Sequence, residues 1–285
     1  MSATPYPEPG RRRPTGSFPV HQRAAMSIFR PIGRWTAGFF AQVGARVYFV
    51  LDIFRALAEV RTYAPLTITQ MRKIGVDSLP LAGIVAAFIG AVTAFQTTYQ
   101  LFPGIQYSIV GWITRQSIIL ELAPLLTALV LAGRVGARMT AEIGTMRVTE
   151  QIDALETLAY DPVAYLVVPR VIAGITMMPL LTILAIAIGI VAGGLTVVTA
   201  TDVRMLDYTT GLRLTFIPFQ VYYALIKATL FGLFIALICS YEGYITETGA
   251  EGVGRSTARA VVISSVVILM LDALTALYLA PKLAP

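Results

Sequence analysis

Charged residues, cysteine and histidine are all scarce in this chain of 285 residues. Asp, Glu, Lys and Arg make up 13% of it and hydrophobic residues 56%, whereas a soluble domain has about 25% charged residues. So few charges cannot cover a water-facing surface, which excludes an ordinary soluble domain and a disordered chain. The single cysteine, Cys239, excludes an internal disulfide, and the single histidine, His21, excludes histidine-cluster metal sites and histidine-based catalysis.

The net charge of +6 is concentrated near the N-terminus. Residues 1–77 hold 11 basic and 4 acidic residues, whereas residues 78–285 hold 11 and 12. The basic residues are interleaved with apolar ones and no nucleic-acid motif is present, so the charge gives no support to nucleic-acid binding. With a mean hydropathy of +0.72, the chain is predicted to be an all-α integral membrane protein.

The chain divides into three parts. Residues 1–27 contain five prolines and no apolar core of the kind a signal peptide has, so they are predicted to form a disordered cytoplasmic tail. Residues 28–62 have apolar residues at every third or fourth position with charges between them, which predicts an N-terminal amphipathic helix lying in the membrane interface. The alternative is a poorly hydrophobic first span. Residues 63–285 are predicted to form the transmembrane domain.

Five apolar segments are long enough to cross a bilayer, which needs roughly 20 residues. The predicted spans are residues 79–101, 113–132, 165–200, 214–240 and 260–280. Residues 105–112 are expected to lie along the outer interface. With the N-terminus inside, 17 Lys and Arg residues are cytoplasmic and 4 are outside, so the positive-inside rule places the N-terminus inside and the C-terminus outside.

A polar helical segment, residues 138–160, lies between the second and third spans. Its apolar side chains share one face, and residues 138–161 carry two arginines against five acids. An acidic amphipathic helix suits docking into a groove of a partner protein. The alternative is a solvated connector lying on the membrane, but the negatively charged inner leaflet would repel it.

The stretch containing this segment, residues 121–174, closely resembles the MlaE/YrbE permease family, and so does the block at residues 225–277. The strings EQIDALE and AEGVGR carry much of the likeness, which covers about residues 30–285. Members of this family are the membrane subunits of ABC systems that move lipids together with MCE-domain proteins. The resemblance implies a permease domain that works as a homodimer in the bacterial cytoplasmic (inner) membrane, with phospholipid or a related lipid as substrate.

The resemblance also implies that residues 138–160 form a cytoplasmic coupling helix, which docks into a dimeric cytoplasmic ATPase. The matching ATPase-contact residues are Glu150, Gln151, Asp153, Ala154, Leu155 and Glu156. The chain has no G-x-x-x-x-G-K-[ST] motif, so ATP and Mg are expected on the partner ATPase and no cofactor on this chain. An MCE-domain protein is expected on the outer face.

Three ionisable residues fall inside predicted spans: Glu121, Lys227 and Asp272. Each costs about 2.5–3.5 kcal/mol at mid-membrane, so each needs a compensating partner or a function. Helix rise places Lys227 within reach of a carboxylate. A buried ion pair between Lys227 and Asp272 that fixes helix packing and a polar patch lining a lipid-headgroup cavity are both open, and Glu121 is favoured as cavity-lining.

Small residues and aromatics give weaker indications. Gly189-x-x-x-Gly193 and Gly133-x-x-x-Ala137 indicate close helix packing. Phe95, Gln96 and Tyr99, near the outer end of the first span, are candidates for lining the lipid cavity, and an aromatic belt at the interface explains them equally well.

Two other function classes compete with an ATP-driven permease. An ion-coupled secondary transporter of a hydrophobic substrate would use Glu121, Lys227 and Asp272 as a proton relay and need no ATPase. A lipid-modifying enzyme would need a catalytic constellation, and no Ser/His, HExxH or paired-carboxylate pattern is present. No catalytic residue and no metal ligand is predicted, and the chain is not expected to be an enzyme.

Overall fold

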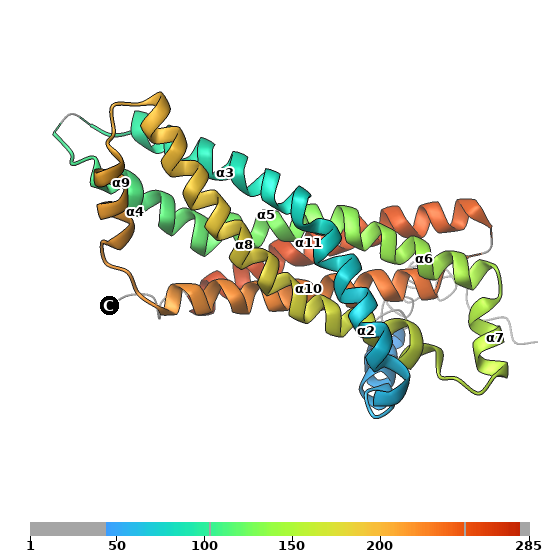
Figure 1. Ribbon diagram of the computed structural model, residues 1–285. Helices are drawn as coiled ribbons and strands as arrows, with labels where there is room; N and C mark the ends of the chain where they lie inside the picture. The colour runs from blue at the N-terminus through green and yellow to red at the C-terminus, as the bar shows by residue number, and fades with distance from the viewer. Residues whose placement is uncertain (1–43, 103, 248, 280–285) are drawn as a thin grey trace, which may run out of the picture. The chain divides into compact units, whose positions relative to one another are not determined.

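The computed structural model describes residues 44–102, 104–247 and 249–279, and all regular structure in these residues is helical (Figure 1). Residues before Phe49 and residues from Phe49 onward form separate units, so the account below concerns the second unit. The predicted tail, residues 1–27, and residues 28–43 of the predicted interfacial helix lie outside the described residues.

Five helical segments among the described residues are long and apolar enough to cross a membrane. They are Thr62–Tyr99, Ser108–Val148, Val163–Ala200, Phe219–Tyr244 and Ala250–Leu279. The prediction of an all-α protein with five transmembrane helices is therefore confirmed.

The start of the first span differs from the prediction. Residues 49–56 are helical, but the helix stops there instead of continuing to residue 62, because residues 57 and 58 form a turn. Helix α2 (Val60–Ile74), the 3₁₀ turn η1 (Val76–Ser78) and α3 (Leu79–Tyr99) then follow. The continuous helical segment thus begins 17 residues before the predicted Leu79, at Thr62, since α2 is too polar to register as apolar sequence.

The second span is a single long helix with two wider turns. It runs through α4 (Ser108–Ser117), the π-helical η2 (Ile118–Leu122), α5 (Ala123–Leu131), the π-helical η3 (Ala132–Gly136) and α6 (Ala137–Val148). Of residues 105–112, predicted to lie along the outer interface, those from Ser108 onward form the first turns of α4. The π-helical turn η2 contains Glu121, one of the ionisable residues predicted to lie within the membrane.

The predicted single helix over residues 138–160 is also wrong, because the structure divides it in two. Helix α6 ends at Val148 and α7 covers Gln151–Thr157. Glu150 between them has φ +58°, and Ala159 after α7 has φ +62°. This left-handed conformation breaks the helical path at both ends of α7, and it turns Ile152 into the core, where it is fully buried.

The remaining helices complete the bundle. They are the π-helical η4 (Val163–Val167), α8 (Val168–Ala200), α9 (Met205–Arg213), α10 (Phe219–Tyr244) and α11 (Ala250–Leu279). Helix α8 is central and packs against α3, α10 and α2. Figure 1 shows α4 and α9 together at one end of the bundle and α7 at the opposite end.

Glycine allows the central helices to touch backbone to backbone. A Cβ at Gly90 of α3 would overlap the carbonyl of Gly189 on α8, and one at Gly174 of α8 would lie 2.7 Å from the carbonyl oxygen of Gly232 on α10. The predicted packing role of Gly189 is confirmed. Gly133 has no neighbour within 4 Å of its Cβ position, so it makes no such contact among the described residues.

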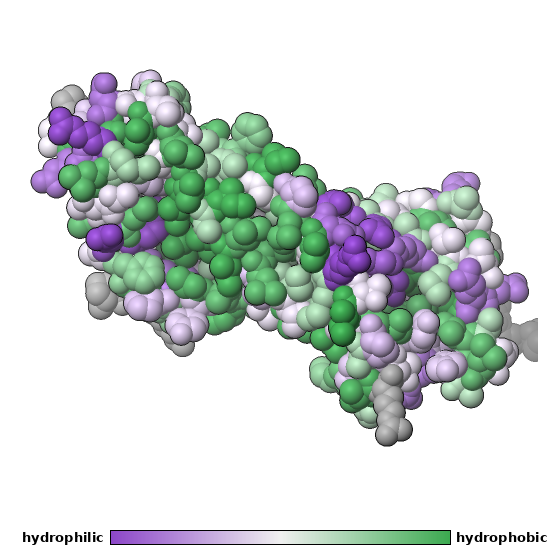
Figure 2. Space-filling model, in the orientation of Figure 1, coloured by the Kyte–Doolittle hydropathy of each residue, from purple (hydrophilic) through white to green (hydrophobic). Residues whose placement is uncertain are grey.

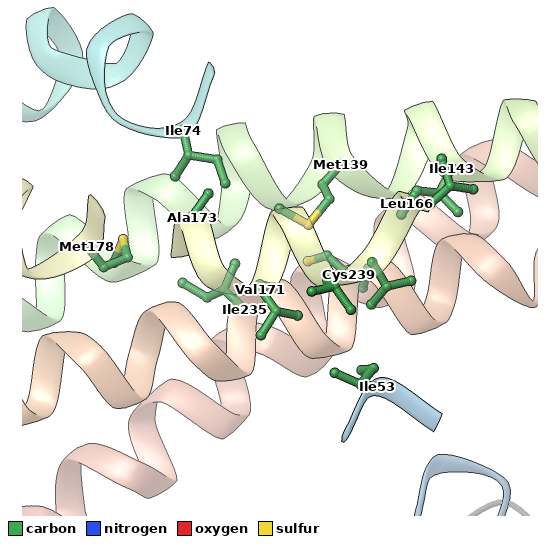
Figure 3. Close-up of a cluster of buried hydrophobic side chains, with 14 of the residues drawn as sticks. Ile53, Ile74, Met139, Ile143, Leu166, Val171, Ala173, Met178, Ile235 and Cys239 are labelled. Carbon is green, nitrogen blue, oxygen red and sulfur yellow. The ribbon is translucent and has the colours of Figure 1, made fainter. Parts of the chain in front are cut away.

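The largest core cluster lies toward the α7 end (Figure 3) and draws on residues 49–56 and on α2, α3, α5, α6, α7, α8, α10 and α11. Ile74 of α2, Met139 of α6, Ala173 of α8 and Ile235 of α10 meet there. Figure 2 shows the complementary surface, in which a broad apolar face covers the middle of the bundle and hydrophilic residues gather toward both ends. That distribution is expected when lipid surrounds the middle of the bundle.

Candidate functional site

The three ionisable residues predicted within the membrane meet at one point. The Nζ atom of Lys227, on α10, lies 2.8 Å from Oε2 of Glu121 and 2.5 Å from Oδ1 of Asp272 on α11. The Lys227 side chain is fully buried, and that of Asp272 is 12% exposed. We call these three residues the charged triad. An ammonium at this depth is stabilised because both neighbouring helices bring a carboxylate to it.

Local sequence explains why the lysine also finds a backbone partner. Pro124 has no N–H to donate to the carbonyl of Leu120, four residues earlier. The adjoining π-helical turn, Ile118–Leu122, widens the helix at the same place. Lys227 Nζ donates to Leu120 O at 3.2 Å, and it also lies 5.1 Å from the centre of the Tyr223 ring, one turn earlier on α10. Its charge is therefore stabilised by two carboxylates, a carbonyl dipole and an aromatic face.

Glu121 differs from the other two members of the charged triad because 43% of its side chain is exposed. It borders a hollow of about 320 Å³ that α4 and η2 form on the surface of the chain. Trp112, Gln116 and Ser117 also line this hollow. The triad thus holds a packing pair, Lys227 with Asp272, and extends through Glu121 to an open, mixed polar and apolar surface.

Phe95, Gln96 and Tyr99 do not belong to this hollow. All three side chains are exposed on α3, and the Phe95 and Tyr99 rings are in contact, with 4.7 Å between their centroids. Tyr99 also lines a second hollow of about 680 Å³ between the loops that follow α3 and α8. The structure therefore separates these residues from the charged triad within one chain.

The segment predicted to contact an ATPase lies at the opposite end of the bundle. Glu150, Gln151, Asp153, Ala154 and Glu156 are exposed and Leu155 is partly buried. Asp153 is held by Arg147 of α6, whose Nη1 lies 2.6 Å from its Oδ1. Two apolar side chains that the sequence did not single out, Leu158 and Tyr160, are 68% and 51% exposed beside them. The result is an acidic surface with an apolar edge, fixed to the bundle through Ile152.

A second set of charges connects α6 to its neighbours. Glu142 of α6 accepts from Lys73 of α2 at 3.4 Å, from Arg138 at 3.0 Å and from Arg170 of α8 at 3.2 Å. We call these four residues the Glu142 cluster. Three cations around one carboxylate leave the cluster positive, and they link three helices where the apolar surface ends.

At the α9 end, Arg115 of α4 is 2% exposed and donates to the carbonyls of Leu212 and Leu214 at 2.7 and 3.0 Å. Trp112 donates to the hydroxyl of Thr215 at 2.9 Å. These bonds fix the connection between α9 and α10. From the sequence, Arg115 is one of the four basic residues assigned to the outer side, and no sequence pattern predicts that its side chain is buried.

Three residues near the charged triad, by contrast, can be identified from their position in the sequence. Tyr223 lies four residues before Lys227, the spacing that places two side chains on one helix face. Gln116 and Ser117 lie within five residues of Glu121 and are the polar positions of an otherwise apolar stretch.

Comparison with known proteins shows the family to which the chain is similar. The family described as Permease MlaE matches residues 67–278. A Rickettsia prowazekii protein named Probable ABC transporter permease protein RP096 is 40% identical over 245 residues, which cover 86% of this chain and 95% of that protein. The Haemophilus influenzae intermembrane phospholipid transport system permease protein MlaE is 34% identical over 248 residues, which cover 87% and 95%. The chloroplastic protein TRIGALACTOSYLDIACYLGLYCEROL 1 of Arabidopsis thaliana is 30% identical over 253 residues, which cover 85% and 69%.

Proposed function

Because the chain belongs to the MlaE permease family, we propose that it is the membrane-spanning permease subunit of an ABC transporter for phospholipid or a related lipid. In this proposal lipid moves between the bacterial cytoplasmic membrane and a conduit made by an MCE-domain protein. The name of the Haemophilus relative supports the substrate class, and five spanning helices support a membrane subunit. The competing ion-coupled secondary transporter has no support from any of these relatives.

The observation that carries the proposal is the exposed surface of α7. Its acidic residues, together with Leu158 and Tyr160, present charge and apolar area on a short helix that projects at one end of the bundle. A helix of this kind suits a groove in a partner. In the proposed complex that partner is a dimeric cytoplasmic ATPase, which binds ATP and Mg, so this chain carries out no bond chemistry.

The distribution of basic residues supports the orientation. Arg134, Arg138, Arg147 and Arg170 lie toward the α7 end, whereas Arg204 and Arg213 flank α9. The positive-inside rule then assigns the α7 end and the N-terminus to the cytoplasm. The α9 end and the C-terminus face outward, where the MCE-domain protein would bind.

The hollow beside Glu121 supports a lipid cavity shared by two copies of the chain. It is open on the surface of one copy, so a second copy facing it would enclose a larger space with a Glu121 on each side. Trp112 and Leu120 offer apolar area to acyl chains, and Gln116 and Ser117 offer hydrogen bonds to a headgroup. ATP-driven movement of the two α7 helices would alternately open and close this space.

The ATPase contact is tested by reversing charge on α7. In the double variant E150K/D153K, we expect co-purification of the ATPase to fall at least about tenfold, since two attractive contacts become repulsive. The matched control is E247K/E251K, which changes one exposed acid just before α11 and one in its first turn. Glu247 is paired with an arginine, as Asp153 is. Unchanged co-purification in E150K/D153K, with the control intact, would refute the ATPase contact.

The lipid cavity is tested with E121A in the assembled transporter. Because Glu121 is only partly buried, we expect the variant to fold and to bind ATPase normally while lipid binding and transport fall. Lipid binding is measured by mass spectrometry of the intact complex and transport by transfer of labelled phospholipid between vesicles. Normal binding and transport in E121A would remove Glu121 from the cavity.

A further inference from the structure

A small pocket lined by both charged and apolar side chains lies at the α7 end of the apolar surface, away from the charged triad. It has a volume of about 20 Å³ and lies between α2, η1, η3, α6 and α8. Its lining includes Lys73, Arg134, Arg138 and Arg170. Glu142 and the neighbouring Asp77 are the carboxylates that contact these cations. Four cations and two carboxylates leave a net positive charge, which attracts an anion.

Two residues that line the pocket each have a buried polar atom without a hydrogen-bond partner among the described residues. The Ser78 side chain is fully buried and its Oγ makes no hydrogen bond, and Arg170 is 5% exposed with an Nε that makes none. A buried polar group without a partner costs about 1–3 kcal/mol, so such groups indicate a missing ligand or ion. Both groups can donate a hydrogen bond, and an anion accepts from both.

The exposed cations beside these groups are positioned to complete the site. Arg134 donates through Nη1 to the backbone carbonyl of Asp77 at 2.7 Å, and this bond uses only one of its guanidinium nitrogens. Arg138 lies one turn further along on α6 and is also exposed. The pocket volume admits about one oxygen-sized group. A tetrahedral oxyanion can place one oxygen inside, near Ser78, and leave the others near the two arginines.

The position of the pocket indicates which kind of molecule would contain the bound anion. Ser78 is followed directly by α3, whose 21 residues include no charge. Its Ile84, Phe88 and Val92 are 57%, 69% and 58% exposed. Figure 2 shows a hydrophilic patch bordering the broad apolar face, near where α2 and α6 run in Figure 1. With lipid around the apolar face, this border lies at the level where the phosphate layer of a leaflet meets its hydrocarbon.

We propose that this pocket binds the phosphate group of a phospholipid whose acyl chains lie along the exposed face of α3. Lys73, Ser78, Arg134, Arg138 and Arg170 would donate to the phosphate oxygens. The site requires only that the helices span a membrane, and it is separate from the cavity beside Glu121. Free phosphate has the same chemistry and is distinguished below.

The test uses the full chain purified in detergent, with lipid binding measured by native mass spectrometry. The probes are dioleoylphosphatidylglycerol and dioleoylglycerol, which differ by the phosphate-bearing headgroup. We expect one tightly held phosphatidylglycerol per chain, retained in E121A, and no comparable retention of dioleoylglycerol. In S78A and R134Q retention should fall about tenfold, whereas R72Q, which removes an exposed charge next to Lys73, should retain the lipid as the unmodified chain does.

Inorganic phosphate separates the two sources of the anion. A phosphate-dependent rise in melting temperature of delipidated protein that S78A lacks would identify free phosphate at the site, and phosphatidylglycerol retention without that rise would identify the lipid headgroup. Either result supports a phosphate site at Ser78. Unchanged phosphatidylglycerol retention in S78A and R134Q, or an equal fall in R72Q, would overturn the proposal. E121A tests the transport cavity independently, so a negative result for the phosphate site would not contradict the transport cavity, and the reverse also holds.

Discussion

Replacing Lys227 with methionine would test whether the charged triad stabilises the fold. The variant keeps the length of the side chain but leaves the carboxylate of Asp272, 12% exposed, beside Glu121 with no ammonium between them. It also removes the donor of Leu120 O. Removing one partner from a buried ion pair costs about 3–5 kcal/mol. At roughly 2 °C per kcal/mol for a chain of this size, K227M should lower the melting temperature by roughly 6–10 °C.

The single cysteine provides the assay. Cys239 is fully buried, so a fluorogenic thiol reagent added to purified protein in detergent reports when the bundle opens. The control variant E121Q/K227M/D272N removes all three charges while keeping similar side-chain shapes. Because neutral replacement of a buried ionic group is often tolerated, we expect it to regain most of the lost stability.

Two results would contradict a stabilising role of the charged triad. One is a melting temperature of K227M within about 2 °C of the unmodified chain, which would mean that water or rearrangement already compensates the carboxylates. The other is a triple variant no more stable than K227M, which would mean that packing around the methionine, and not unpaired charge, causes the loss.

Two further predictions concern packing. G90A should destabilise the bundle by about 1–3 kcal/mol, because its Cβ would overlap the Gly189 carbonyl, whereas G254A, which meets no neighbour within 4 Å, should be neutral or stabilising by up to about 1 kcal/mol; equal melting temperatures would contradict this. Y208F should lose about 0.5–1.5 kcal/mol with the 2.9 Å bond from the Tyr208 hydroxyl to Ile190 O. Burial raises the pKa of Tyr208, so the unfolded chain ionises first, near pH 10, and the stability advantage over Y208F should shrink between pH 8 and pH 11. An advantage that does not change with pH would refute that assignment.

The apolar segments predicted the spans well, but not where their helices end. Hydropathy reports which residues can face lipid, and it carries no signal for a polar helix that continues beyond the membrane. Helix α2 and the last turns of α6 are of this kind. The break at Glu150 could not be predicted either, because a left-handed glutamate depends on the tertiary contacts that bury Ile152.

The charged triad shows the same limit. The rise per residue of a helix gave the depth of Lys227 and so predicted that a carboxylate lies within reach. Depth alone does not give the rotation of the side chain about the helix axis, and that rotation decides which carboxylate Lys227 contacts. In the structure Lys227 contacts both Glu121 and Asp272. The exposed positions of Phe95 and Gln96 depend on rotation in the same way. By contrast, from the sequence Glu142 is only one of the five acids in residues 138–161, because its partners Lys73 and Arg170 are distant in sequence.

The Glu142 cluster has a mechanical consequence for the proposed transporter. Helix α7 is tied to α6 by the Arg147–Asp153 pair and by buried Ile152, and α6 is tied through Glu142 to both α2 and α8. A force applied to α7 is therefore transmitted through these few contacts to α6, α2 and α8. We expect a displacement of α7 to tilt α6, and α2 and α8 to tilt with it. A small movement of α7 outside the membrane would then change the tilt of the membrane-spanning helices along their whole length.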